Sequence, residues 1–422
     1  MPIKNFLLGS AFYSIGNMVG AGLNMMFQFI LIIFLTTNDY GIIQPLLQFV
    51  GLLILPMSAY QFALTKHYAN MTAEELEQES LYTASNINKL SVIFTVIWLL
   101  VIPIFKKVFH INDTLIFVLL FFSLLMNMLQ MPYVCRLQAE KKFFKAGLAQ
   151  IIQGCTRISF GVICVWLYPT IWGAMYGILI SNVAFIFGNI FEYKKEVFKS
   201  VDCNFIPKNF SLRLLFVSLG SVGLFSLLIY SDTVLVRILR PEDSALFSSA
   251  NLLGKGMIFL TAGISFVILP LMASSLKESK KSLWIGFGCL LILVLSYVGF
   301  FFLSAPFLAQ ILFKNEPQIF TYFQTFMPYY NLMFIPYPLI YYFLNYYLVQ
   351  ENPFYPYLLA IGVAGLYSGI AYKHETIYEI TNIIGLVGYT LLSIVILHAL
   401  ISKDKGIIHE EQIDESSIEN LI

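Results

Sequence analysis

Long apolar segments recur along this chain, and they constrain its fold more than any other feature. Twelve of them alternate with short polar connections. A membrane-spanning helix needs about 20 mostly apolar residues, and each segment has that length or comes close to it. The segments are Leu7–Leu35, Ile42–Leu64, Leu90–Phe105, Leu115–Val134, Gly147–Leu167, Ile171–Phe191, Leu214–Leu239, Ala245–Met272, Leu283–Phe307, Phe320–Val349, Tyr355–Tyr372 and Ile377–Ile401.

The pattern within the segments predicts helices rather than strands. In hydrocarbon every backbone N–H and C=O group needs an internal partner, which restricts spanning structures to helices and closed barrels. Barrel strands are about ten residues long and alternate apolar with polar residues, whereas runs such as Leu115–Leu129 do not alternate. We therefore predict an all-α integral membrane protein with twelve transmembrane helices. The tenth segment contains Pro328, Pro336 and Pro338, which predict a kink or a break.

The low share of charged residues excludes several classes of protein. Only 12% of the 422 residues are Asp, Glu, Lys or Arg, against roughly 25% in an average soluble domain. That is too little charge for the surface of a soluble enzyme, and the 58% hydrophobic content excludes a disordered chain. A net charge of +1 gives no attraction for nucleic acid. The five cysteines are scattered, without a CxxC pair, so they predict neither a disulfide framework nor a zinc site.

Lysine and arginine are distributed unevenly between the connections. If the N-terminus is cytoplasmic, 17 of the 25 basic residues fall on the cytoplasmic side. Cytoplasmic connections are enriched in basic residues, so we predict that both termini are cytoplasmic. Three basic residues lie within spans, and the five on the outer side are Lys106, Lys107, Arg240, Lys314 and Lys373.

The two halves of the chain resemble each other at a short polar connection. Thr36–Gly41 joins the first two segments, and Arg240–Ala245 joins the seventh and eighth, about 204 residues later. Six spans per half give both halves the same orientation, which predicts two parallel repeats around a central cavity. We expect a six-helix lobe over 1–192, a cytoplasmic surface linker over 193–213, a second six-helix lobe over 214–401 and a polar cytoplasmic tail over 402–422. Ala73–Ser85 is expected to form a separate acidic cytoplasmic helix.

Enzyme chemistry has little support in the sequence. The motifs HExxH, GxSxG, GxGxxG and the P-loop are absent, and the five histidines are far apart. No connection is long enough for a soluble catalytic domain. We therefore predict no catalytic residue, no metal site and no cofactor.

Ionisable residues within the spans are the informative feature. A charge near the middle of the membrane costs roughly 2.5–3.5 kcal/mol on insertion scales, so such groups usually face a bundle interior or a wet cavity. They are Arg157, Asp232, Arg237 and Lys255, accompanied by polar residues that include Asn17, Asn24, Gln28, Gln48, Gln61 and Asn251. The spacing of Asn17, Asn24 and Gln28 places them on one helix face. We predict a cationic central cavity that suits an anionic head group.

Two other interpretations of these polar residues remain open. Asp232 can pair with Arg237 or Lys255 in a structural network, with the amides holding helices together. The tyrosines of the tenth segment can stack on sugars, or they can form an aromatic belt and pack against lipid. These are Tyr329, Tyr330, Tyr337, Tyr341, Tyr342, Tyr346 and Tyr347.

The seventh and eighth segments resemble a known family. Tyr230–Val236, Pro241–Ala245, Phe247–Asn251 and Val267–Leu271 are similar to bacterial polysaccharide flippases, the O-antigen and capsule repeat-unit exporters of the multidrug/oligosaccharidyl-lipid/polysaccharide exporter superfamily. The family often has a basic residue where this chain has Leu252, and Lys255 follows one turn later.

The resemblance implies a substrate and a location. The substrate would be an oligosaccharide on undecaprenyl pyrophosphate, flipped across the bacterial inner membrane by alternating access for O-antigen, capsule or related polysaccharide synthesis. We expect substrate contacts at Lys255, Arg237, Arg157, Asn24, Gln28 and Asn251. Asp232 is the candidate for ion coupling. Membrane lipids, and the polymerase and chain-length proteins of the same pathway, are the expected partners.

Three alternatives remain. An ion-coupled drug antiporter of the same superfamily would be expected to carry several embedded carboxylates, and this chain has one clear one, Asp232. A membrane polysaccharide polymerase or ligase would be expected to carry a large outer loop. A non-transporting scaffold would have no need for charges within the spans.

Overall fold

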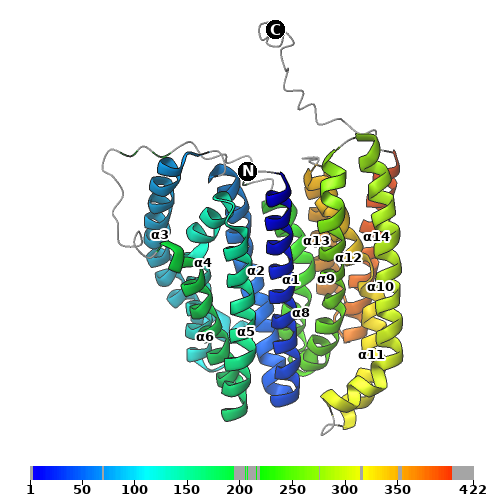
Figure 1. Ribbon diagram of the computed structural model, residues 1–422. Coiled ribbons are helices and arrows are strands. Elements are labelled where there is room, and N and C mark those ends of the chain that lie inside the picture. Colours follow the sequence, from blue (N-terminus) through cyan, green and yellow to red (C-terminus); the bar gives the residue numbers. More distant parts are fainter. Residues whose placement is uncertain are drawn as a thin grey trace, which may run out of the picture.

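The structure is a computed structural model that describes residues 3–68, 71–193, 205, 207, 215, 219–274, 276–313, 317–349 and 354–401. The described part is a bundle of roughly parallel and antiparallel helices with no strand (Figure 1). This all-helical architecture agrees with the predicted fold class. The predicted linker over 193–213 and the predicted tail over 402–422 lie almost entirely outside the described residues, so the domain boundaries stay predictions.

Six long helices make up the first half of the chain, here defined as residues 3–193. Short connections join them, so that neighbouring helices run in opposite directions (Figure 1). They are α1 (Ile3–Phe34), α2 (Thr37–Tyr68), α3 (Ala73–Val108), α4 (Thr114–Ala139), α5 (Phe143–Leu167) and α6 (Ile171–Ile190), followed by a short turn, η1 (Phe191–Tyr193).

The second half, residues 219–401, is also helical, and one of its predicted segments is divided into two helices. Its elements are η2 (Leu219–Gly223), α8 (Leu224–Leu239), η3 (Pro241–Asp243), α9 (Ser244–Ser274), α10 (Leu276–Leu312), α11 (Pro317–Phe334), α12 (Pro336–Val349), α13 (Phe354–Tyr372) and α14 (Ile377–Ile401). The division between α11 and α12 falls at Ile335 and Pro336. The break predicted in the tenth segment is therefore present, because proline cannot donate the next backbone hydrogen bond.

The third helix differs from its prediction. The acidic stretch Ala73–Ser85 is helical, but it is continuous with the apolar segment instead of forming a separate helix. Thr72 caps its start in a capping box, in which the Thr72 hydroxyl accepts from the Glu75 N–H and the Glu75 carboxylate accepts from the Thr72 N–H. No residue between the acidic and apolar parts breaks the helix, so the backbone hydrogen bonds simply continue.

The exterior of the bundle is apolar. Ten helices within the described residues are long and apolar enough to cross a membrane. Large apolar side chains point outward along them, including Leu100 at 72% exposed and Leu303 at 82% exposed. Water would not tolerate so large an apolar surface, whereas lipid does. The chain is a multi-pass membrane protein; the count of twelve spans and their internal repeat stay predictions.

Close helix packing in the first half depends on glycine. A Cβ atom added to Gly16 on α1 would lie 2.7 Å from the backbone of Gly147 on α5. Small residues of this kind allow helices in a membrane to approach each other and gain van der Waals contact. As a result α1 packs most extensively against α5, while α2 packs against α4.

The two halves meet along α1, α2, α8 and α9, and two ends of the bundle can be distinguished. We call the end at which α1 begins and α14 finishes the terminus end (top in Figure 1), and the opposite one the elbow end. At the elbow end the Ser244 hydroxyl donates to the Gly41 carbonyl at 2.7 Å, and His110 Nε2 lies 3.3 Å from the Ile238 carbonyl. These contacts join the first half to the second there.

The tyrosines of the tenth segment are mostly internal. Five of the seven are at most 2% exposed, and they pack in the core of the second half: Tyr330, Tyr337, Tyr342, Tyr346 and Tyr347. The Tyr337 hydroxyl donates to the Ile384 carbonyl at 2.9 Å, and the Tyr342 hydroxyl donates to the Leu283 carbonyl at 3.0 Å. The core position of these five rings differs from both interpretations drawn from the sequence, an aromatic belt and a sugar-stacking surface.

Candidate functional site

A cavity of about 240 Å³ lies between the two halves. Helices α1, α2, α8 and α9 line it. Its polar lining consists of Asn24 and Gln28 from α1, Gln48 from α2, and Tyr230 and Lys255 from α8 and α9. We call this space the central cavity.

Lys255 is held at the edge of the central cavity by a carboxylate. Its Nζ atom lies 3.2 Å from Asp232 Oδ1 and 3.3 Å from Gln48 Oε1, and it sits 5.4 Å from the centre of the Tyr230 ring. Lys255 is 9% exposed and Asp232 is fully buried. An isolated charge would be costly here, so the ion pair and the amide oxygen together stabilise both charged forms.

Asp232 accepts hydrogen bonds on both of its oxygens. Besides Lys255, its Oδ1 accepts from the Thr233 N–H at 2.6 Å and the Thr233 hydroxyl at 3.1 Å. Its Oδ2 accepts from Asn251 Nδ2 at 2.5 Å and from the Tyr330 hydroxyl at 3.0 Å. Asp232 is therefore the common acceptor of this network, and it pairs with Lys255.

A glycine allows Tyr330 to reach this carboxylate. A Cβ atom at Gly254 would lie 2.6 Å from the Tyr330 ring. Asn251, one turn earlier on α9, also donates to the Tyr330 hydroxyl, while its own Oδ1 is buried without a hydrogen-bond partner. The network thus ties α8, α9 and α11 together, and it leaves one buried acceptor beside the ion pair.

Asn24 and Gln28 both line the central cavity, with different partners. Gln28 Oε1 accepts from Gln44 Nε2 on α2 at 2.8 Å. Asn24 Oδ1 is buried and has no hydrogen-bond partner. An unpaired buried oxygen of this kind costs free energy unless water or a ligand bonds it. Asn24 therefore offers an open position for a hydrogen-bond donor.

Arg237 lies away from the central cavity, at the elbow end. Its Nε donates to the Phe109 carbonyl of the first half at 3.1 Å, and its Nη1 donates to the Pro241 carbonyl at 3.5 Å. The predicted pairing of Asp232 with Arg237 does not occur, because Asp232 pairs with Lys255. At this position Arg237 joins the two halves.

Arg157 also lies outside the central cavity. On α5 it faces α6, where its Nε donates to Ser181 Oγ at 2.9 Å and its Nη2 donates to Asn182 Oδ1 at 3.0 Å. Among the charged residues predicted to bind substrate, the structure therefore places one, Lys255, at the central cavity.

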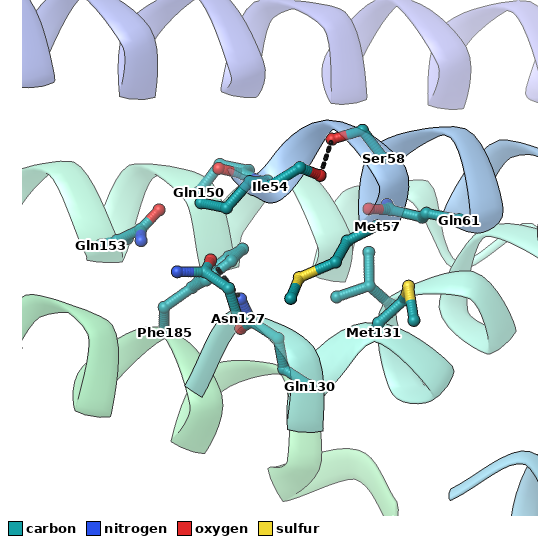
Figure 2. A pocket seen from close by; sticks show the side chains of 11 residues that line it. Ile54, Met57, Ser58, Gln61, Asn127, Gln130, Met131, Gln150, Gln153 and Phe185 are labelled. Atoms are coloured by element: carbon teal, nitrogen blue, oxygen red, sulfur yellow. Dashed lines mark hydrogen bonds between the residues drawn. The ribbon is translucent and has the colours of Figure 1, made fainter. Parts of the chain in front are cut away.

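A second cavity, of about 220 Å³, lies within the first half between α2, α4, α5 and α6 (Figure 2). We call it the amide pocket, because its polar lining is Ser58 and five amide side chains: Gln61, Asn127, Gln130, Gln150 and Gln153. The sequence interpretation noted Gln61 alone. The spacing of three between Asn127 and Gln130, and between Gln150 and Gln153, was the available signal, since it places each pair on one helix face.

Metal ligands do not gather anywhere in the described part of the chain, where no group of three or more His, Cys, Asp or Glu side chains is positioned to hold an ion. The chemistry that this arrangement permits is binding: a lysine for an anion, and amides for hydrogen-bonding groups.

Comparison with known proteins finds similar solved structures but no similar sequence. No protein-family model matches the sequence, and no curated protein is a significant match. Solved structures do match. An inward-facing multidrug resistance MATE family transporter of the MOP superfamily aligns with a TM-score of 0.75 at 14% identity, covering 90% of this chain and 93% of that one. The lipid II flippase MurJ in an inward closed conformation aligns with a TM-score of 0.74 at 15% identity, covering 92% and 87%.

An outward-facing MATE family transporter aligns with a TM-score of 0.62 at 14% identity, covering 99% of this chain and 97% of that one. At these identities the likeness establishes the fold, which is that of MOP superfamily transporters.

Proposed function

We propose that this protein is a flippase that moves polyprenyl-pyrophosphate-linked oligosaccharides across the bacterial inner membrane. The observation that carries the proposal is Lys255, a buried cation beside a polar cavity at the centre of the bundle, between two halves that alternating access would move. In the proposed orientation the terminus end is cytoplasmic. The pyrophosphate would enter from there and bind Lys255, while the polyprenyl chain stays in lipid.

The ion pair suggests how binding would be coupled to an ion. Lys255 is neutralised by Asp232, so an arriving pyrophosphate competes with that carboxylate for the ammonium group. Protonation of Asp232, or binding of a cation to it, would free Lys255 for the phosphate and keep the site close to neutral. Asp232 is therefore our proposed coupling residue.

Arg237 has a different proposed role from the one expected from the sequence. Its bond to the Phe109 carbonyl must break if the halves separate at the elbow end. Outward opening would then release a dianionic head group to the positive side of the membrane, which is favourable by about 2.3 kcal/mol per charge per 100 mV.

A drug antiporter of the same fold is the second candidate, because MATE family transporters are among the structural matches. The lining of the central cavity favours the flippase: among the described residues it contains no carboxylate to bind a cationic drug, and its polar groups are a lysine, amides and a tyrosine. A polymerase or a scaffold is favoured by no observation, and partnership with polymerase or chain-length proteins stays a prediction.

The test is a deletion strain. We expect lipid-linked repeat units to accumulate on the inner leaflet and surface polysaccharide to be lost, with restoration by the wild-type gene and no restoration by Lys255→Met at equal protein level. A strain that displays single repeat units on its outer leaflet would indicate a polymerase. Normal surface polysaccharide together with increased sensitivity to cationic drugs would indicate an antiporter.

A further inference from the structure

The amide pocket is separate from the central cavity and is built differently. Its walls come from α2, α4, α5 and α6, whereas α1, α2, α8 and α9 form the central cavity. No charged side chain lines it, and its apolar lining is aliphatic or thioether except for Phe185 (Figure 2). It therefore lacks a counter-ion for an anion or a cation, and it lacks the several aromatic rings expected around a flat apolar drug.

The chemistry of the amides in the amide pocket restricts the class of ligand that can bind there. Each side-chain amide offers two N–H donors and a carbonyl acceptor within a few ångströms. A sugar hydroxyl is likewise both a donor and an acceptor, so a ring of amides can satisfy several hydroxyls without any net charge. Neutral polyols are the ligand class that this lining matches.

Three of the amides are fixed by their neighbours. Gln130 Nε2 donates to Asn127 Oδ1 at 3.1 Å, and Gln130 Oε1 accepts from Asn189 Nδ2 at 3.3 Å. Gln153 Nε2 donates to Asn182 Oδ1 at 3.2 Å. These bonds join α4, α5 and α6, so the three amides hold the walls of the pocket in place.

The other two amides have no such role. The side chains of Gln61 and Gln150 line the pocket, and within the described residues neither makes a hydrogen bond to another protein group (Figure 2). They come from two different helices, α2 and α5. Unpaired amides that converge on a cavity of about 220 Å³, roomy enough for several water molecules, can bond water or a ligand.

The position of the pocket fits an extended ligand. Gln61 follows Gln48 by 13 residues on α2, which corresponds to about 20 Å along the helix toward the terminus end. A lipid-linked oligosaccharide whose pyrophosphate lies at Lys255 could extend its sugars in this direction, toward the end from which we propose that it enters.

We propose that the amide pocket binds an uncharged sugar of the lipid-linked oligosaccharide, with Gln61 and Gln150 as its contact residues. The inference rests on the proposed function, and it assigns the sugar end of the substrate to the first half of the chain. The central cavity would recognise the pyrophosphate common to all such lipids, and the amide pocket would discriminate between sugars.

The experiment compares two probes on the purified full-length protein in lipid nanodiscs. One probe is the pool of lipid-linked saccharides extracted from the source cells, and the other is undecaprenyl pyrophosphate without sugar. We expect the double variant Gln61→Leu/Gln150→Leu to bind the saccharide pool about tenfold more weakly, because several hydrogen bonds are lost. Its affinity for the sugar-free lipid should be unchanged.

The control is Gln324→Leu on α11, which removes a half-buried amide that lines neither cavity. It should bind both probes as the wild type does. Gln61 and Gln150 leave no protein partner unpaired within the described residues, so the single variants serve if the double variant does not fold.

The outcomes separate the two proposals. If the wild-type protein binds neither probe, the proposed function fails and the sugar site fails with it. If it binds both probes and the double variant still binds the saccharide pool as tightly, or loses both probes equally, the flippase proposal stands and the sugar site is wrong; the pocket then holds water only.

Discussion

The two cavities differ in the kind of polar group that each one buries. The central cavity contains a lysine that is paired with a carboxylate. The amide pocket, of similar size, contains amides and a serine but no charge. A buried ion pair is often no more stable than an apolar replacement, whereas neutral amides bury at much lower cost. The groups around the central cavity thus include a charged pair, whereas the polar groups that line the amide pocket are all neutral.

A substitution of Lys255 tests the difference between the two cavities most strongly. Replacing it by Met leaves Asp232 buried without its counter-charge, and loss of one partner of a buried pair costs about 3–5 kcal/mol. We expect Lys255→Met to lower the free energy of unfolding by that amount, unless Asp232 takes up a proton. Thermal unfolding in detergent measures the change.

A second variant separates stability from function at this pair. The double replacement Lys255→Met/Asp232→Asn removes both charges, so most of the lost stability should return. Transport should stay absent, since the group for the anion is gone. Recovery of surface polysaccharide by the double variant would contradict a role for Lys255 in substrate binding.

Within the amide pocket, amides with protein partners can be compared with amides that have none. Gln130→Leu leaves Asn127 Oδ1 without its donor and removes one of the two acceptors of Asn189 Nδ2, and a buried unsatisfied polar group costs about 1–3 kcal/mol. Gln150→Leu strands no partner within the described residues, so its unfolding free energy should stay within about 0.5 kcal/mol of the wild type. Equal destabilisation by the two variants would show that Gln150 is structural.

Arg237 tests the contact between the halves that closes the elbow end. A hydrogen bond from a charged donor contributes about 1.5–3 kcal/mol, so its removal should shift the equilibrium roughly ten- to hundredfold. We expect Arg237→Ala to increase labelling of an Ala21→Cys probe in the central cavity by a thiol reagent applied from the elbow side, in a background without native cysteines.

Arg240→Ala is the matched control. Arg240 lies three residues later, and its bonds to Glu242, Asp243 and Glu375 all stay within the second half. Its removal should leave labelling at the wild-type rate. If both arginine variants increase labelling equally, the effect of Arg237 does not come from the contact between the halves.

The smallest expected effect concerns Glu140, between α4 and α5. Burial raises the pKa of Glu140, but hydrogen bonds from Lys142, Arg136 and Tyr193 outweigh it, so the pKa is lowered from the ordinary value of 4.5. A depressed carboxyl pKa stabilises the fold above 4.5, and this stability is lost as the pH falls through the folded-state pKa.

We therefore expect Glu140→Gln to be less stable than the wild type at pH 7, by less than about 1 kcal/mol, because solvent screens a partly exposed group. The difference should shrink as the pH falls below about 4.5. Thermal midpoints of the two proteins from pH 7 to pH 3 measure it, and a difference that grows at low pH would contradict the interpretation.

The sequence by itself determined the helical membrane fold, because the requirement to pair every backbone group in lipid leaves few alternatives for long apolar segments. It also predicted a kink or a break in the segment with Pro328, Pro336 and Pro338, because proline lacks a backbone donor; the structure places the break at Pro336. The central position of Lys255 and its companions Asn24 and Gln28 followed from the same reasoning, since polar groups on apolar helices turn inward.

The tertiary structure alone decided which buried groups meet. All three spanning cations satisfy the rule that charge avoids lipid, yet only Lys255 reaches the central cavity, while Arg237 joins the halves and Arg157 faces α6. The sequence did not reveal the amide pocket for the same reason: amides on three helices become a site only when packing brings their faces together. Hydrophobic periodicity shows which face of a helix is buried. Which residues of other helices contact that face depends on how the helices are rotated and packed.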